Sequence, residues 1–281
     1  MLPWTEVPQM KPINAGPITR LLVILFVSVR SHRYLRWLWK PASGVITISN
    51  ICIKVKPSVG LAEANAMLLV AQHTSLPVPK VYCAFVHKEV TFLVMSRLRG
   101  TIAQYRWVYR SEESKAKILA QLDQMVIELR SVPVPDQATV SSVGGGPFYD
   151  CRLPSGLLWG PFDTIREFHK ALAGGIDFDI DYAGMPDDVH ELFEFYRRSD
   201  HQLVLTHGDL SSLNILVDGD DVVGIVDWET AGWFPRYWEY TCAKYVNPYN
   251  EFWEQEIDKF IEPMPYELGV ERTRKKCFGA S

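Results

Sequence analysis

The amino-acid sequence predicts an α+β protein of two lobes, a small β-rich N-terminal lobe and a larger, mainly helical C-terminal lobe. Between residues 45 and 95, strand and helix patterns follow one another in the order strand, strand, helix, strand, strand. From residue 98 onward, apolar residues recur mainly at helical spacing. The 281 residues, 47% of them hydrophobic, are ample for two lobes. We therefore expect one lobe over residues 1–97 and the other over residues 98–281.

The N-terminal lobe opens with an apolar stretch that is too short to cross a membrane. Residues 21–29 (LLVILFVSV) are bracketed by two arginines, whereas a spanning helix needs roughly 20 apolar residues. A signal peptide is the alternative, but a clear small-residue cleavage site is lacking here. We therefore expect a buried leading helix and no membrane span. The basic, aromatic residues 31–40 could form a nucleic-acid or membrane patch. A solvated helix face with Trp37 and Trp39 packed inward is the favoured interpretation.

The rest of this lobe has the pattern of a sheet with one helix. Residues 45–56 are rich in β-branched side chains and predict two short strands. Residues 60–73 have apolar positions at helical spacing and predict a helix. Two more strands are expected at 80–86 and 90–95, with a turn near Lys88.

The C-terminal lobe begins with a long helix. Residues 112–130 open with acidic side chains, which suit the positive end of a helix dipole. Further helices are expected at about 163–172 and 187–199. The triple glycine at 144–146 could cradle a phosphate, but no strand precedes it and Pro147 follows it. A plain loop is therefore favoured there.

Composition narrows the kinds of partner. The net charge of −4 gives no sign of the basic stripe that nucleic-acid binding favours. The five cysteines are odd in number and scattered, with no C-x-x-C pair. A zinc site of the usual spacing is therefore not expected, and a reducing, cytoplasmic location is the simplest interpretation.

One segment carries the chemistry, residues 203–229 (LVLTHGDLSSLNILVDGDDVVGIVDWE). An apolar strand leads to Asp209, and Asn214 follows five residues later. A strand, a turn and a return strand then end at Asp227. Because a hairpin folds its two ends together, Asn214 and Asp227 should lie side by side, near Asp209.

These three side chains suit phosphoryl transfer. The transferred group is nearly metaphosphate-like, so catalysis is mostly positioning and charge neutralisation. One carboxylate must hold the attacking hydroxyl, while a second carboxylate and an amide oxygen suit Mg²⁺. Each residue alone could merely cap a turn or a helix, but the set around one hairpin favours the catalytic interpretation.

The sequence resembles the aminoglycoside phosphotransferase and choline-kinase-like family in three motifs, HGDL (207–210), NIL (214–216) and IVDWE (225–229). It also resembles the fungal-type branch of that family in the segments ICIKVK, LAEANAMLLVAQHTSLPVPKVY, FLVMSRLRG and AGWFPRYWEY. The resemblance covers residues 45–260. It implies a protein-kinase-like fold, with a nucleotide-binding N-terminal lobe and a C-terminal lobe for catalysis and acceptor binding.

The resemblance further implies ATP or GTP as co-substrate, Mg²⁺, and a small hydroxylated molecule as acceptor. By position, Asp209 would be the catalytic base, and Asn214 and Asp227 the metal ligands. Lys54 would grip the nucleotide phosphates, and Glu63 would hold Lys54.

The residues around Lys54 agree with that role. Lys54 stands on a strand between two apolar residues, where an unpaired ammonium would be costly. Glu63, on the next helix, is a plausible partner. Lys56 is the alternative for the same role, and Lys54 could also be an ordinary exposed strand lysine.

Three departures from the kinase motifs matter. No G-x-G-x-x-G precedes Lys54, which leaves a nucleotide-binding pseudokinase or regulatory protein of this fold as the alternative. Gly208 stands where eukaryotic protein kinases have Arg, and no Ala-Pro-Glu segment follows Asp227. Both points favour a small-molecule acceptor over a protein.

The acceptor itself stays open. Alternating carboxylates at Asp177, Asp179 and Asp181 could face a cationic acceptor, although a solvated loop is favoured. The aromatic residues at 233–240 could stack on a quaternary ammonium. Packing within a core helix is the favoured interpretation for them.

Overall fold

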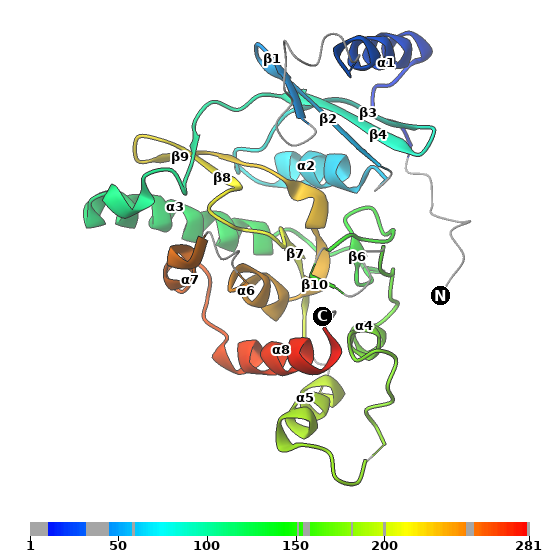
Figure 1. Cartoon of the computed structure of the whole chain (residues 1–281), viewed down its shortest axis with the longest axis vertical. Coiled ribbons are helices and arrows are strands. Elements are labelled where there is room, and N and C mark those ends of the chain that lie inside the picture. The colour runs from blue at the N-terminus through cyan, green and yellow to red at the C-terminus, as the bar shows by residue number, and fades with distance from the viewer. Residues whose placement is uncertain are drawn as a thin grey trace.

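The computed structural model describes residues 11–31, 45–57, 60–150, 152–153, 158–180, 182–198, 201–245 and 250–279. These residues form a β-rich N-terminal lobe above a mainly helical C-terminal lobe (Figure 1). The predicted α+β fold of two lobes is thereby confirmed. The predictions for Trp37, Trp39 and Asp181 lie outside the described residues.

The N-terminal lobe is a four-stranded antiparallel sheet in the order β1-β2-β4-β3. Its strands confirm the predicted segments and end close to the expected bounds: β1 (Val45–Ile48), β2 (Ile51–Pro57), β3 (Val81–His87) and β4 (Val90–Ser96). Helix α1 (Pro17–Ser31) covers one face of the sheet, and α2 (Ala62–His73) covers the other (Figure 1). Side chains alternate between the two faces. Ile53 and Phe85 therefore pack toward α1, while Leu93 packs toward α2.

Helix α1 confirms the predicted leading helix but contradicts its predicted burial. Val27 is its one fully buried apolar residue, whereas Leu21 and Leu25 are 57% and 52% exposed. The helix covers the sheet with one side only, and its sequence is apolar on the other side as well. An apolar stretch of sequence shows that a segment is hydrophobic, but it does not show whether another element packs against its second side. No helix within the described ranges is long and apolar enough to cross a membrane.

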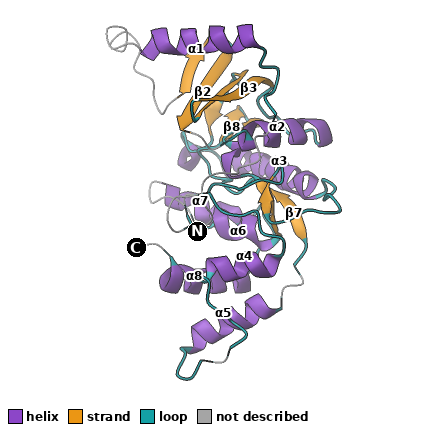
Figure 2. Ribbon diagram, turned by 90° about the vertical axis from the view of Figure 1, so that its right-hand side faces the viewer, coloured by secondary structure: helices purple, strands orange, loops and turns teal. Residues whose placement is uncertain are grey.

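The C-terminal lobe is built from helices around two small sheets. The helices are α3 (Glu112–Arg130), α4 (Ile165–Leu172), α5 (Asp187–Arg197), α6 (Tyr237–Ala243), α7 (Glu251–Ile257) and α8 (Pro265–Phe278), with the 3₁₀ turns η1 (Trp107–Tyr109) and η3 (Trp228–Thr230). The sheets have the orders β6-β10-β7 and β5-β8-β9. Their strands are β5 (Thr101–Ile102), β6 (Ser141–Ser142), β7 (Leu203–Thr206), β8 (Ile215–Asp218), β9 (Asp221–Ile225) and β10 (Gly232–Pro235). The helices predicted near 112–130, 163–172 and 187–199 are all present (Figure 2).

Local capping explains where α3 begins. The Ser111 hydroxyl accepts a hydrogen bond from the backbone N–H of Ser114 at 3.2 Å, and two glutamates occupy the first turn. Both features satisfy the free donors and the positive dipole at a helix N-terminus. The helix therefore starts at the residue that the sequence predicts.

One hydrophobic core joins the two lobes. It combines α2 side chains such as Met67 with Ile225 and Trp228 from the segment that ends the β8–β9 hairpin. The backbone N–H of Ile225 also donates to the carbonyl of Pro77, at 2.8 Å. Trp233, Tyr237, Trp238 and Tyr240 are buried, as their core interpretation predicts, but only the last three lie on a helix, α6, because Trp233 belongs to the strand β10. This shared core fixes the hairpin under the N-terminal lobe.

Candidate active site

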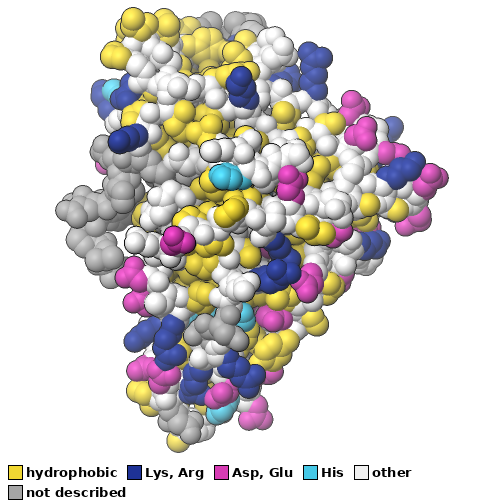
Figure 3. Space-filling model, turned by 180° about the vertical axis from the view of Figure 1, so that it is seen from behind, with side chains coloured by type: hydrophobic (Ala, Val, Ile, Leu, Met, Phe, Trp, Pro, Cys, Tyr) yellow, Lys and Arg dark blue, Asp and Glu magenta, His cyan; other side chains and the backbone are white. Residues whose placement is uncertain are grey.

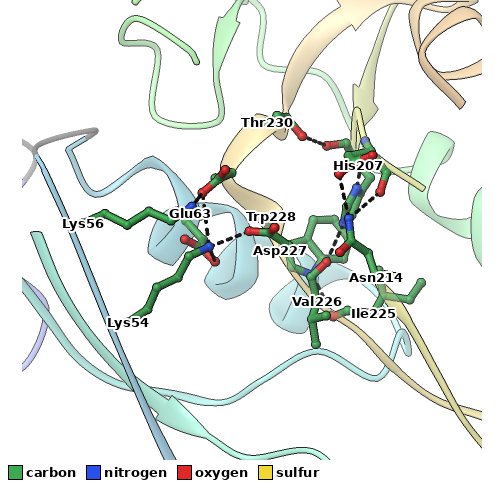
Figure 4. Close-up of polar contacts among 12 residues, drawn as sticks. Lys54, Lys56, Glu63, His207, Asn214, Ile225, Val226, Asp227, Trp228 and Thr230 are labelled. Atoms are coloured by element: carbon green, nitrogen blue, oxygen red, sulfur yellow. Dashed lines mark hydrogen bonds and ion pairs between the residues drawn. The ribbon is translucent and has the colours of Figure 1, made fainter. Parts of the chain in front are cut away.

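Lys54 is the buried cation between the lobes. Strand alternation turns its side chain toward α2, and it is 7% exposed. Its Nζ lies 2.8 Å from Glu63 Oε1 and 2.5 Å from Asp227 Oδ1 (Figure 4). The predicted ion pair of Lys54 with Glu63 is confirmed. A third carboxylate, that of Glu229, lies 3.2 Å from the same nitrogen.

Lys56 lies two residues further along the same face of β2. The sequence alone therefore could not decide which of the two lysines points into the site. Its side chain is 33% exposed, against 8% for Lys54, and it pairs with Glu229. Lys54 alone contacts both the helix α2 and Asp227. The structure therefore places Lys54, not Lys56, at the centre of the cluster.

The opposite charges of Lys54 and Asp227 stabilise each other, whereas burial outweighs the Lys54 charge at Glu63 and raises the pKa of that carboxyl. Burial by itself would lower the pKa of Lys54, but the carboxylates of Glu63, Asp227 and Glu229 outweigh it, and the pKa is raised. Partial burial would raise the pKa of Asp227, but the Lys54 ammonium outweighs that effect, and the pKa is lowered. Lys54 and Asp227 are therefore both ionised at neutral pH.

The β8–β9 hairpin brings its two ends together as predicted. Ile215 pairs with Ile225, and the N–H of Val226 donates to the carbonyl of Asn214 at 2.9 Å. Asp227 follows with a φ of 65°, a left-handed conformation that Asp and Asn adopt more readily than most residues. Asn214 and Asp227 consequently stand next to each other on adjacent ends of one hairpin.

Asp209 lies beside Asn214. The Asn214 amide nitrogen donates to the carbonyl of Asp209 at 2.9 Å and to its Oδ2 at 2.8 Å. Because the nitrogen is directed at Asp209, the amide oxygen of Asn214 is left for another partner. Hydrogen bonds thus link Asp209 to Asn214, and backbone pairing links Asn214 to the segment that ends at Asp227. Lys54, held by Glu63, contacts the Asp227 carboxylate.

The loop that carries Asp209 is held by a residue that sequence reasoning missed. Glu239, on α6, is 2% exposed and accepts hydrogen bonds from the N–H groups of His207 and Gly208, at 2.6 and 3.0 Å. The Thr230 hydroxyl donates to the carbonyl of His207 at 2.9 Å. The sequence did contain one signal for this role, a single Glu within the aromatic run RYWEY. A carboxylate buried among aromatic side chains needs hydrogen-bond donors.

Gly208 is required by the same packing. Its φ is +80°, and a Cβ at this position would lie 2.9 Å from the carbonyl oxygen of Thr230. On the other side, the Arg152 guanidinium donates to the carbonyl of Gly208 and pairs with the buried Asp150, with 2.6 Å between Nη2 and Oδ2. Nothing in the spacing of the sequence pointed to Arg152.

The donor set suits a hard divalent cation. Glu63, Asp227 and Glu229 each offer one carboxylate oxygen within 4.8 Å of the others, and the Lys54 ammonium contacts all three carboxylates. Asn214, whose backbone pairs with the residue before Asp227, offers a neutral amide oxygen. Carboxylate and amide oxygens are the ligands that Mg²⁺ prefers, so the residues present fit the predicted metal. Glu63 and Glu229 lie beside the ligands that the sequence suggested, but both of them pair with lysines.

Comparison with known proteins places the chain in a family. Residues 30–262 match the model of the phosphotransferase enzyme family (APH). An aminoglycoside 3'-phosphotransferase from Niallia circulans is 24% identical over 60% of this chain. Another from Enterococcus faecalis is 25% identical over 58% of this chain. The matched segment spans 58% and 57% of the length of these two relatives.

Solved structures show the same fold. The aminoglycoside phosphotransferase APH(4)-Ia in a ternary complex with ADP and hygromycin B superimposes with a TM-score of 0.56 and 15% identity, over 88% of this chain and 91% of that one. The gentamicin complex of APH(2")-IIa gives a TM-score of 0.52 and 15% identity, over 86% and 83% of the two chains. These similarities confirm the protein-kinase-like fold.

Proposed function

Because the chain belongs to the phosphotransferase enzyme family, we propose that it transfers the terminal phosphoryl group of ATP or GTP to a hydroxyl of a small molecule. The observation that carries the proposal is the placement of two groups around Asp227. Lys54 and Glu63 lie on one side of this carboxylate, and the bonded pair of Asp209 and Asn214 lies on the other. A cation, an oxygen-rich pocket and a loop carboxylate are the parts that phosphoryl transfer uses.

In this proposal Lys54 binds the nucleotide phosphates, and Glu63 holds the Lys54 side chain in place. Asn214 and Asp227 hold Mg²⁺, with Glu229 close enough to assist. When bound, the ion neutralises phosphate charge. Residues 1–97 form the nucleotide-binding lobe, and residues 98–281 form the lobe for catalysis and acceptor binding.

Asp209 acts on the acceptor. Its carboxylate orients the hydroxyl and accepts the proton as the oxygen bonds to the terminal phosphorus. The bond from that phosphorus to the bridging oxygen breaks, and the nucleoside diphosphate leaves. Glu239 and Arg152 hold the loop of Asp209 from two sides, which keeps the carboxylate at one position. Such positioning is most of what the protein contributes to this reaction.

A nucleotide-binding pseudokinase is the second candidate. It is favoured by one feature, the lack of a G-x-G-x-x-G motif in the sequence before Lys54. In either case we place the protein in the cytoplasm, where nucleoside triphosphates are available. The four cysteines within the described ranges, Cys52, Cys83, Cys242 and Cys277, are free, which is consistent with a reducing compartment.

A screen with labelled ATP and GTP against a panel of hydroxylated metabolites tests the proposal. The panel should include gentamicin and hygromycin B, which the structural neighbours bind. The Asp209→Asn variant, purified in parallel, controls for contaminating kinases. Turnover that this variant lacks supports the kinase and excludes the pseudokinase. Thermal stabilisation by Mg-nucleotide with no turnover on any acceptor would favour the pseudokinase.

A further inference from the structure

Helix α1 presents an apolar face that no other described element covers. Five of its residues form this outward stripe at helical spacing, with exposures between 52% and 75%: Ile18, Leu21, Leu22, Leu25 and Val29. The opposite side packs on the sheet through Val23, Ile24 and Val27. Figure 3 shows hydrophobic side chains gathered at this end of the molecule. Surface patches of this kind generally mark an interaction site.

The sequence around this face is strongly basic. The segment from Lys11 to Gly44 contains six Lys or Arg residues and no Asp or Glu. It therefore carries +6, and the remainder of the chain carries −10, since the net charge is −4. Arg20 is turned toward the sheet, with its guanidinium 5.6 Å from the centroid of the Phe85 ring. The five residues of the outward stripe are uncharged, and in the sequence the other five basic residues of this segment precede or follow them.

The position of α1 leaves the candidate active site open. The helix lies on the outer face of the sheet (Figures 1 and 2). Lys54 instead contacts Glu63 of α2, on the other face, and Asp227 of the C-terminal lobe. A flat partner on α1 would therefore not cover the site. With 15 residues, the helix is also too short to span a bilayer but long enough to lie along its surface.

We propose that the outward face of α1 docks onto the surface of a bilayer that contains anionic phospholipids. The apolar stripe enters the boundary between headgroups and acyl chains, and the basic residues before and after it, Lys11 and Arg30, contact the lipid phosphates. An uncharged apolar stripe flanked by basic residues is the pattern of a helix that lies in the membrane interface. A second copy of the chain suits the face less well. A two-fold contact through α1 would bring together two copies of residues 11–31, which carry three basic and no acidic side chains.

Vesicle flotation with the full chain tests this proposal. Vesicles of phosphatidylcholine alone are compared with vesicles that also contain phosphatidylserine. We expect the protein to float with the mixed vesicles, and binding to weaken as salt is added. The double variant Leu21→Gln/Leu25→Gln should bind the mixed vesicles about ten-fold more weakly than the parent, because it removes two apolar side chains from the stripe.

The matched control is Ile127→Gln, which removes a 55% exposed apolar side chain from α3, in the other lobe. It should bind mixed vesicles as the parent does, and thermal melting should show that all three proteins are folded. Failure of the parent to float with mixed vesicles overturns the proposal, as does equal loss of binding in the control. Equal binding to both kinds of vesicle rejects the anionic component. Light scattering that shows a dimer, dissociated by the double variant, would instead assign the face to a second copy.

Discussion

Asn214 donates its side-chain amide to the Asp209 carboxylate at 2.8 Å and to the Asp209 carbonyl at 2.9 Å. The variant Asp209→Asn should therefore keep the geometry of the site and lose only the negative charge, because its amide oxygen can still accept the hydrogen bond from Asn214. We expect turnover to fall by about 10²–10⁴, the usual contribution of a positioned base. Nucleotide affinity should stay within a few-fold, measured by calorimetry. Parental turnover in this variant would remove Asp209 from the mechanism.

Lys54→Ala should damage both stability and nucleotide binding. It leaves the Glu63 carboxylate, 14% exposed, without its ammonium partner. Removing one member of a buried pair typically costs about 3–5 kcal/mol. Lys56→Ala is the matched control, because this more exposed pair should contribute about 1 kcal/mol or less. Urea unfolding and nucleotide titration measure the two effects. Equal behaviour of the two variants would contradict the central position of Lys54.

Asp227→Ala should remove the dependence of nucleotide binding on Mg²⁺. The variant deletes the carboxylate that lies next to Asn214 and within reach of Glu63 and Glu229. Asp221→Ala, at the far end of the same hairpin, serves as the control. The measurement is nucleotide affinity with Mg²⁺ and with a chelator. If the Asp227 variant still binds Mg-nucleotide as tightly as the parent, Glu229 becomes the next candidate ligand.

Glu239→Ala should loosen the loop that carries Asp209. It removes the acceptor of the N–H groups of His207 and Gly208 and leaves two buried donors unpaired. We expect a lower melting temperature and faster hydrogen exchange at these two amides. Turnover should fall by about ten-fold or more, because misplacement of a catalytic group is costly. Unchanged exchange at His207 and Gly208 would show that Glu239 does not hold the loop.

Stability should fall as the pH drops below the ordinary pKa of histidine. Burial, with the nearby His201 and Arg166, lowers the pKa of His169 from 6.5 to about 3. The unfolded chain therefore takes up a proton below pH 6.5 that the folded protein does not. His169 should cost about 1.5 kcal/mol of stability between pH 6.5 and 5. Urea unfolding of the parent and of His169→Gln between pH 6.5 and 5 measures this effect, and the variant should lack the loss of stability due to His169. If the free energy of unfolding of the variant depends on pH as that of the parent does, other groups cause the loss.

The sequence predicted contacts between residues that a short stretch of chain connects. Asp209, Asn214 and Asp227 could be placed together because one hairpin connects two of them and a short loop connects the third. The ion pair of Lys54 with Glu63 was within reach for the same reason, since the two residues are nine positions apart.

Long-range contacts could not be predicted in this way. Arg152 and Gly208 are separated by 56 positions, and Glu239 and Gly208 by 31. No local pattern says that these groups meet, because the meeting depends on how whole helices pack. The exposure of Leu21 and Leu25 was missed for a related reason: periodicity gives the face of a helix but not what lies against it.

The core that runs from α2 to the β8–β9 hairpin also makes the two lobes one cooperative unit. Met67, Ile225 and Trp228 share a single cluster, and the hydrogen bond from Ile225 to Pro77 crosses between the lobes. Neither lobe can open without exposing apolar surface of the other. Heat should therefore melt the protein in a single calorimetric transition, whose van't Hoff and calorimetric enthalpies agree.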